Sequence, residues 1–376
     1  MIAPAVDAPA SSLTGATGRI AFAPVKATWL YANLALGLLA LPYRAGAGTF
    51  AAGFALTFLT LCVGHSVGLH RGIIHRTYRC PRSVRCALAY LFVLSGLGGP
   101  VAWMGVHYAR DHWQNRADCP RFFGYGHGIA VDYHWNLHCA FLAGPSAPHA
   151  VPEEDASDPF LMFLQRTWMV HPILLAAVVA ALFGPAVAGV TCCLRVGAGI
   201  LGHWFVGYVS HKVGYMRYAL DDASSEGRNV LVLGVLSFGE GFHNNHHAHP
   251  GSARMGMKWY ELDAGWAVVR CLEALGWIHD VRAWHRAGQV SKAGARAIAA
   301  RFVGPGRLRR ADRRSSERDP TGANAGARAA AGRGAARGSA PRPGRRSQTT
   351  GAAHPQETVV QAIHAMCSTG TTSDRS

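Results

Sequence analysis

Histidines are the residues of this chain whose type and spacing point most directly to chemistry. His243, His246 and His247 stand at positions i, i+3 and i+4, so on a helix all three imidazoles lie on one face. Neutral imidazole is a ligand for iron, zinc and copper. The spacing therefore predicts half of a metal site on one helical turn, and the alternative is a solvated histidine-rich loop.

A second pair far upstream, His70 and His75, makes that alternative less favourable. Five residues turn an α-helix through about 140°, so one face of a continuous helix cannot hold both imidazoles. We expect the helix to end or bend between them, which Gly72 permits. His65 lies more than a turn before His70, and we expect it to be a core or substrate-channel histidine.

The runs His70-Arg-Gly-Ile-Ile-His75 and Gly241-Phe-His-Asn-Asn-His-His247 resemble the first and third histidine boxes of the membrane-bound fatty acid desaturases. The resemblance is closest to bacterial acyl-CoA and acyl-lipid desaturases of the stearoyl-CoA type, and it covers roughly residues 25–285. Spacing alone indicates a metal site, with two ions. The resemblance implies two non-haem irons, O2 as co-substrate, a fatty acyl substrate, and no catalytic residue beyond the metal centre.

The middle box departs from the family pattern Arg-Asp-His-x-x-His-His. Only His112 matches a metal-binding histidine, and Asn115 and Arg116 stand where two more are expected. Arginine has no acceptor and cannot bind a cation. The site is therefore either degraded or completed by nearby ligands, and we favour the second because both outer boxes are intact.

Nearby residues offer such ligands. His107 and Asp111 are at i, i+4 on one helical face, and a carboxylate beside imidazoles is ordinary in iron sites. His138 is a further candidate, while His127 and His134 are weaker ones.

The last apolar segment supplies another histidine. By the resemblance, His211 is a further iron ligand, and Gly207 replaces an Asn of the family one turn earlier, which puts a water-mediated contact in doubt. His203 is deeper, and its role stays open. The predicted ligands are His70, His75, His112, His211, His243, His246 and His247, with His107, Asp111 and His138 as further candidates. Three polar residues are expected to support them: Glu240, Gln114 and Asn244.

The composition predicts a polytopic membrane protein. The chain is 49% hydrophobic and 15% charged, against about 25% charged in soluble domains. Apolar segments at about 27–43, 49–68, 168–187 and 193–211 are near the roughly 20 residues that a bilayer needs. The segment at about 86–105 is broken by glycines and Pro100, so we expect it not to span. The expected fold is all-α, with four transmembrane helices and a helical cap that holds a di-iron site.

Basic residues set the expected orientation, because Lys and Arg mark the cytoplasmic side. They follow the second and fourth segments: Arg71, Arg76, Arg79, Arg82, Arg85, Lys212 and Arg217. The histidine clusters should then face the cytoplasm from the inner membrane. Arg195 lies about 24 Å of helix before His211, so we expect it to reach the opposite interface.

Both ends of the chain differ from the predicted membrane domain at 26–288. Residues 1–25 are expected to be flexible, without a signal peptide. Residues 289–376 carry 16 Lys and Arg against 5 Asp and Glu, or +11 of the total +16. This Ala-, Gly- and Arg-rich tail is too poor in apolar residues to order itself. Contact with anionic lipid or a simple solvated tail is expected, and not nucleic-acid binding.

Other functions fit less well. The nine cysteines contain no CxxC pair, which argues against a disulfide framework or zinc ribbon. His249-Pro250-Gly251 resembles the haem motif of cytochrome b5 but lacks a surrounding domain, so electrons should come from a separate donor, a ferredoxin or similar protein with its reductase. A haem protein or metal transporter would place histidines within the spans and not at one interface. A related lipid or carotenoid hydroxylase or ketolase stays open, as do the acyl chain length, the head group and the double-bond position.

Overall fold

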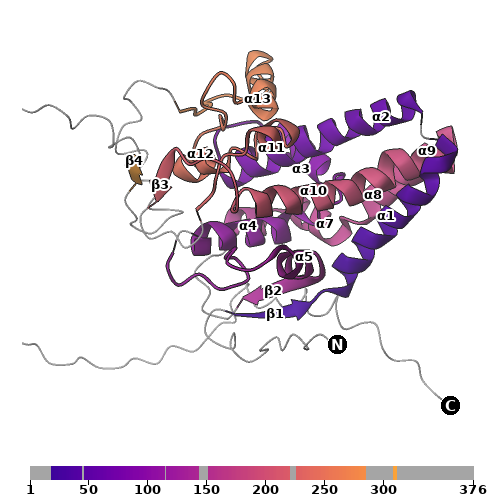
Figure 1. The fold of residues 1–376 in the computed structure, drawn as a ribbon. Helices are drawn as coiled ribbons and strands as arrows, with labels where there is room; N and C mark the ends of the chain where they lie inside the picture. The colour runs from indigo at the N-terminus through magenta and orange to yellow at the C-terminus, as the bar shows by residue number, and fades with distance from the viewer. Residues whose placement is uncertain are drawn as a thin grey trace, which may run out of the picture. The chain divides into compact units, whose positions relative to one another are not determined.

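A computed structural model describes residues 18–44, 46–114, 116–143, 151–220 and 226–284, together with the strand at 308–310. It is mostly helical, which confirms the predicted all-α membrane fold (Figure 1). The helices are α1 (Pro24–Arg44), α2 (Ala47–Thr57), η1 (Phe58–Ile74), α3 (Arg82–Val93), α4 (Pro100–Gln114), α5 (Ile129–His138), α6 (Glu153–Ala156), α7 (Pro159–Thr167), α8 (Val170–Phe183), α9 (Pro185–Ala188), η2 (Gly189–Leu194), α10 (Arg195–Val209), α11 (Leu231–Leu236), α12 (His243–Ala248) and α13 (Ala264–Ala274). The strands are β1 (Gly18–Phe22), β2 (Cys139–Ala143), β3 (Tyr218–Leu220) and β4 (Leu308–Arg310).

Three continuous helices in the described part of the chain are long and apolar enough to cross a membrane. They are α1, the run of α2 into η1 (Ala47–Ile74), and the run of α9 through η2 into α10 (Pro185–Val209). Three of the four predicted spans are thereby confirmed. As expected, the apolar segment at 86–105 does not span, because α3 and α4 divide it.

The remaining predicted span, at about 168–187, has a different form. α8 has only 14 residues, and it qualifies as a span only with α7, from which it bends by 63°. Asp158 starts α7 by accepting hydrogen bonds from the backbone N–H groups of Phe160 and Leu161. Arg82 and Arg85 of α3 pair with the same carboxylate at 3.0 and 3.2 Å. These ion pairs hold α7 against α3. The chain therefore bends between α7 and α8, before the apolar residues of α8 begin.

Small residues let the spans approach closely. α1 packs along η2 and α10, and a Cβ on Gly37 would lie 2.5 Å from the backbone of Leu194. η1 packs on α3 in the same way, with Gly64 against the backbone of Leu91 and Phe92. Close backbone contact of this kind is how helices associate within a bilayer. It fixes η1, which carries His70, and α10, which ends two residues before His211.

Arg195 does not extend outward from the bundle, as the predicted contact with the opposite interface would require. Its side chain is buried, and its guanidinium donates to Thr60 Oγ1, to the carbonyl of Leu94 and to the carbonyl of Thr191. These three oxygen atoms solvate the guanidinium charge inside the bundle. Burial of an ion is tolerated where hydrogen bonds replace those to water. Arg195 therefore ties the last span to η1 and to the end of α3.

Short strands accompany the helices. β1 pairs antiparallel with β2, with Ile20 opposite Phe141, and β3 pairs with β4. β1 falls within the N-terminal 25 residues that were predicted to be flexible. Apart from β4, the predicted tail at 289–376 lies outside the described residues. The eight described cysteines are free.

Candidate metal centre

Seven histidines converge in two groups whose ligand atoms lie within 4.8 Å of one another in each group. The four-histidine group consists of His70, His75, His107 and His246, and the three-histidine group of His211, His243 and His247. Six of these seven were in the main predicted set, and His107 was a further candidate.

The first pair meets by a route that the sequence did not reveal. η1 is a π-helix, and the backbone N–H of His75 donates to the carbonyl of His70 at 3.0 Å. In this i→i−5 pattern, residues five apart lie one turn apart, so both imidazoles share a face. Of the two expected alternatives, an end or a bend between the histidines, η1 does not bend at Gly72 and ends only at Ile74, so a change of helix type brings the ring centroids to 4.8 Å. π-Helical segments frequently occur at functional sites.

The third box serves both groups. His243, His246 and His247 stand on the single turn of α12, as predicted. His246 joins the four-histidine group, with its ring centroid 4.6 Å from that of His75, while His243 and His247 join His211. One turn of helix therefore lies between the two groups and supplies ligands to each.

The Nε2 contacts within the groups fit a cation better than they fit hydrogen bonds. His243 Nε2 lies 3.1 Å from His211 Nε2 and 3.0 Å from His247 Nε2, and His75 Nε2 lies 3.0 Å from His107 Nε2. A neutral imidazole nitrogen carries one proton or one lone pair, so His243 Nε2 can satisfy only one of its two neighbours. Two ligands about 2.1 Å from one ion and at right angles to each other are about 3.0 Å apart. The donor sets therefore fit metal ions.

Burial keeps these imidazoles in the form that binds metal. Desolvation, and then the neighbouring histidines, lower the pKa of His75, His243 and His246 well below the usual value. His70 Nε2 and His246 Nδ1 are buried and have no hydrogen-bond partner among the described residues. Neutral rings with unused nitrogens are what a metal site requires.

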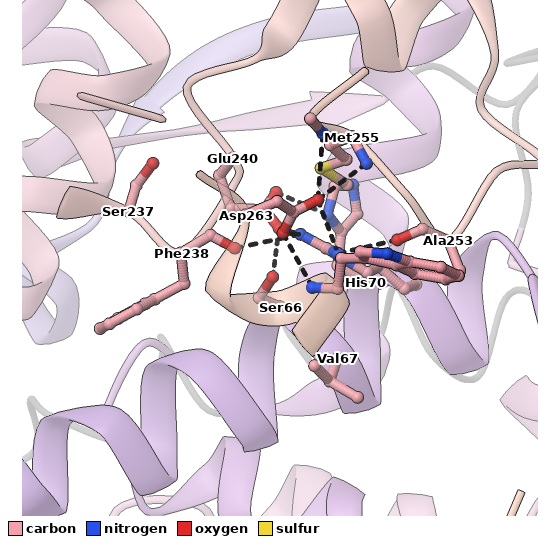
Figure 2. Close-up of polar contacts among 12 residues, drawn as sticks. Ser66, Val67, His70, Ser237, Phe238, Glu240, Ala253, Met255 and Asp263 are labelled. Carbon is pink, nitrogen blue, oxygen red and sulfur yellow. Dashed lines mark hydrogen bonds and ion pairs between the residues drawn. The ribbon is translucent and has the colours of Figure 1, made fainter. Parts of the chain in front are cut away.

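Glu240 lies beside the Nδ1 atom of His70 (Figure 2). Its Oε2 is 2.7 Å from His70 Nδ1, and its Oε1 accepts a hydrogen bond from Ser66 Oγ at 2.5 Å. A carboxylate at Nδ1 directs the lone pair of Nε2 toward the metal position and raises the basicity of the ring. The structure thus brings the predicted Glu240 to one specific ligand, His70.

Arg71 anchors this carboxylate, and sequence reasoning did not find it. The side chain is fully buried, with Nη2 3.8 Å from Glu240 Oε1 and 2.9 Å from Asp263 Oδ1. It also donates to the carbonyls of Phe238 and Ala253 (Figure 2). The buried charge is therefore shared by two carboxylates and two carbonyls. It ties η1 to the segments before α12 and α13.

The middle box is arranged differently from the family pattern. His112 belongs to neither group, and its ring centroid lies 4.8 Å from that of Trp113. His107 is the α4 residue that joins the four-histidine group, and Asp111 Oδ2 lies 3.2 Å from His107 Nε2. Burial would raise the pKa of Asp111, but the charge and hydrogen bond of His107 outweigh it and lower that pKa. Asn115 lies outside the described residues.

The other predicted residues lie further away. His138 contacts the hydroxyl of Tyr31 at 2.8 Å and belongs to neither group. Gln114 donates to the carbonyl of Phe123 at 3.0 Å. Asn244 holds α12 through the backbone of Tyr218, with which it makes hydrogen bonds in both directions. It thus positions the helix and not an imidazole.

Comparison with known proteins agrees with this site. A family model described as fatty acid desaturase matches residues 46–281. The chain belongs to this family. It is 32% identical over 231 residues to the sn-1 stearoyl-lipid 9-desaturase of Anabaena variabilis, an alignment that covers 60% of this chain and 81% of that protein. It is 31% identical over 236 residues to the Delta-9 acyl-lipid desaturase 2 of Arabidopsis thaliana, with 60% and 74% covered.

An acyl-CoA 5-desaturase of Anemone leveillei is 28% identical over 238 residues, with 61% of this chain and 70% of that protein covered. The family match includes every residue of the two histidine groups. As a member of this desaturase family with several apolar helices, the chain is a membrane protein.

Proposed function

We propose that this protein is an O2-dependent desaturase that introduces a double bond into a fatty acyl chain at two histidine-bound irons. The convergence of seven imidazoles into two groups, with Nε2 contacts that protons cannot all satisfy, carries the proposal. The named relatives act on acyl chains held in lipids or on CoA. The substrate class is therefore a long acyl chain delivered by the membrane.

The residues of this chain would divide the work as follows. The four-histidine group would hold one iron, and the three-histidine group the other, with Asp111 as an additional ligand beside them. When bound, the irons supply the O2 activation that removal of hydrogen from a methylene requires. Glu240 orients His70, and Arg71 holds Glu240 in place. Burial of His70, His75 and His246 limits the access of water to the four-histidine group.

The site faces the cytoplasm from the inner membrane in this proposal. Arg76, Arg79, Arg82 and Arg85 follow the end of η1 that carries the histidines, and such basic segments stay on the cytoplasmic side. Reducing equivalents would come from a separate ferredoxin-like donor on that side, because the haem-like run His249-Pro250-Gly251 closely follows the third histidine box. The basic tail at 289–376 would contact anionic lipid.

Lipid profiling of a host that expresses the chain tests the proposal. Desaturation gives acyl chains lighter by two hydrogens, whereas the alternative hydroxylase or ketolase chemistry adds oxygen. The matched control is His246→Ala, which removes one ligand of the four-histidine group. Host lipids that are the same with the wild-type chain, the variant and an empty vector would refute the proposed reaction.

A further inference from the structure

Three aromatic rings form a second layer beneath the metal centre. His65, Trp103 and His203 come from η1, α4 and α10. The ring centroid of His65 lies 4.7 Å from that of Trp103 and 4.9 Å from that of His203, and the last two are 5.6 Å apart. We call these three side chains the ring layer.

The ring layer touches the four-histidine group directly. Trp103 stacks on His107 with centroids 5.5 Å apart and an interplanar angle of 10°, and His65 stacks on His70 at 6.1 Å and 15°. His65 lies five residues before His70, which in the π-helix places it on the same row one turn deeper in the span Ala47–Ile74. The layer therefore lies on the membrane side of the group.

His65 is a polar group in an apolar position. Its side chain is 4% exposed, and its Nε2 has no hydrogen-bond partner among the described residues. Phe92 contacts it from another side, with centroids 6.1 Å apart. Burial of an unpaired imidazole within a span is unfavourable, and an isoleucine or leucine would suit a simple alkyl chain better. The position therefore points to a ligand with a hydrogen-bonding atom.

Resting on the proposed desaturase function, we propose that the ring layer binds an oxygen atom on the acyl chain beside the carbons that react. The preferred substrate is then an oxygen-bearing acyl chain, such as a hydroxy- or oxo-acyl group. The ring layer lies on the same side of the histidine groups as the membrane spans. An acyl chain that enters from the bilayer therefore approaches the histidine groups from the side of the ring layer. A neutral imidazole either donates or accepts, so His65 and His203 suit both a hydroxyl and a carbonyl.

Equilibrium binding to the zinc-loaded full chain tests this, because zinc has no redox chemistry and the substrate is not consumed. The ligands are octadecanoyl chains and a positional series of monohydroxy-octadecanoyl chains, each presented as a CoA thioester and as a phospholipid. We expect one hydroxy isomer to bind about 5- to 150-fold more tightly than the unsubstituted chain, because the unsubstituted chain leaves the buried imidazole unpaired. His65→Leu and His203→Leu should abolish this preference and keep the bound metal.

The control is His171→Leu. This histidine lies in α8, where it contacts Tyr90 and Thr167 away from the ring layer, so the variant should keep the preference. Equal binding of all isomers by the wild-type chain would overturn the inference, since the layer would then hold only water or pack passively. Loss of metal in both leucine variants would overturn it as well. A wild-type chain that binds neither metal nor any acyl chain would instead refute the proposed function.

Discussion

Replacement of Glu240 by Gln should weaken one metal position and leave the other unchanged. The carboxylate lies 2.7 Å from His70 Nδ1, so it orients only a member of the four-histidine group. Loss of such a carboxylate partner lowers metal affinity about 10- to 100-fold, or about 1.4 to 2.8 kcal/mol. The three-histidine group contains no His70 and should retain its affinity.

The fold should tolerate this substitution. Arg71 keeps both oxygens of Asp263 as acceptors, at 2.9 and 3.3 Å, as well as two backbone carbonyls. The amide of Gln can still accept the hydrogen bond from Ser66. A buried charge is therefore not left unpaired, which is what makes such substitutions severe.

The assay is a metal titration of the purified chain against buffered free zinc, with bound metal measured by mass spectrometry. Wild-type protein should fill two positions, and in Glu240→Gln the midpoint of one step should rise about 10- to 100-fold. Glu273→Gln is the control, because this carboxylate pairs with Arg270 on the outer part of α13. If the midpoints of both titration steps rose equally, or if neither rose, Glu240 would not act through His70.

Further predictions concern the ligands themselves. His246→Ala should remove one of two bound metals, and loss of both or of none in the titration would contradict the division into two groups. Asp111→Asn should lower metal content more than His112→Ala, because only Asp111 lies beside the four-histidine group. A larger loss of metal in His112→Ala would instead indicate that His112 is the ligand, as in the family pattern. The metal-free protein should lose thermal stability as the pH falls below about 6.5, because burial lowers the pKa of His75 and His243 in the folded state below the value in the unfolded chain. The loss in the free energy of unfolding is up to about 1.4 kcal/mol per pH unit for each buried ring. A melting temperature that is constant from pH 8 to 5 would contradict this.

Composition and spacing sufficed for three of the four predicted spans and for identifying the residues of the outer boxes. The thickness of the bilayer sets the length of an apolar span, and that length can be counted directly in the sequence. The helical turn of α12 follows from the i, i+3, i+4 spacing of its histidines. The partners of Arg195 were not readable, because Thr60 and Leu94 come from segments distant in sequence. Arg71 was missed for the same reason: its acceptor Asp263 lies 192 residues away.

Helix type explains why the two pairs with five-residue spacing behave differently. His70 and His75 share a face because η1 is π-helical, with its hydrogen bonds shifted by one residue. α4 is an α-helix, so His107 and His112 are about 140° apart and cannot both face the centre. Once His107 joins the four-histidine group, the residue one α-turn later on the same face is Asp111.

We therefore interpret the altered middle box as a shift along α4 and not as a simple loss. The family spacing His-x-x-His-His falls on His107, Arg110 and Asp111, five residues before the motif match. Arg110 cannot bind a cation, and it donates instead to Tyr125 and Asn136. In the proposed site, Asp111 would replace an imidazole by a carboxylate and would give the centre a negative charge that an all-histidine site lacks. Such a hard oxygen ligand is common in non-haem iron sites, so the shifted box is compatible with iron and with retained activity.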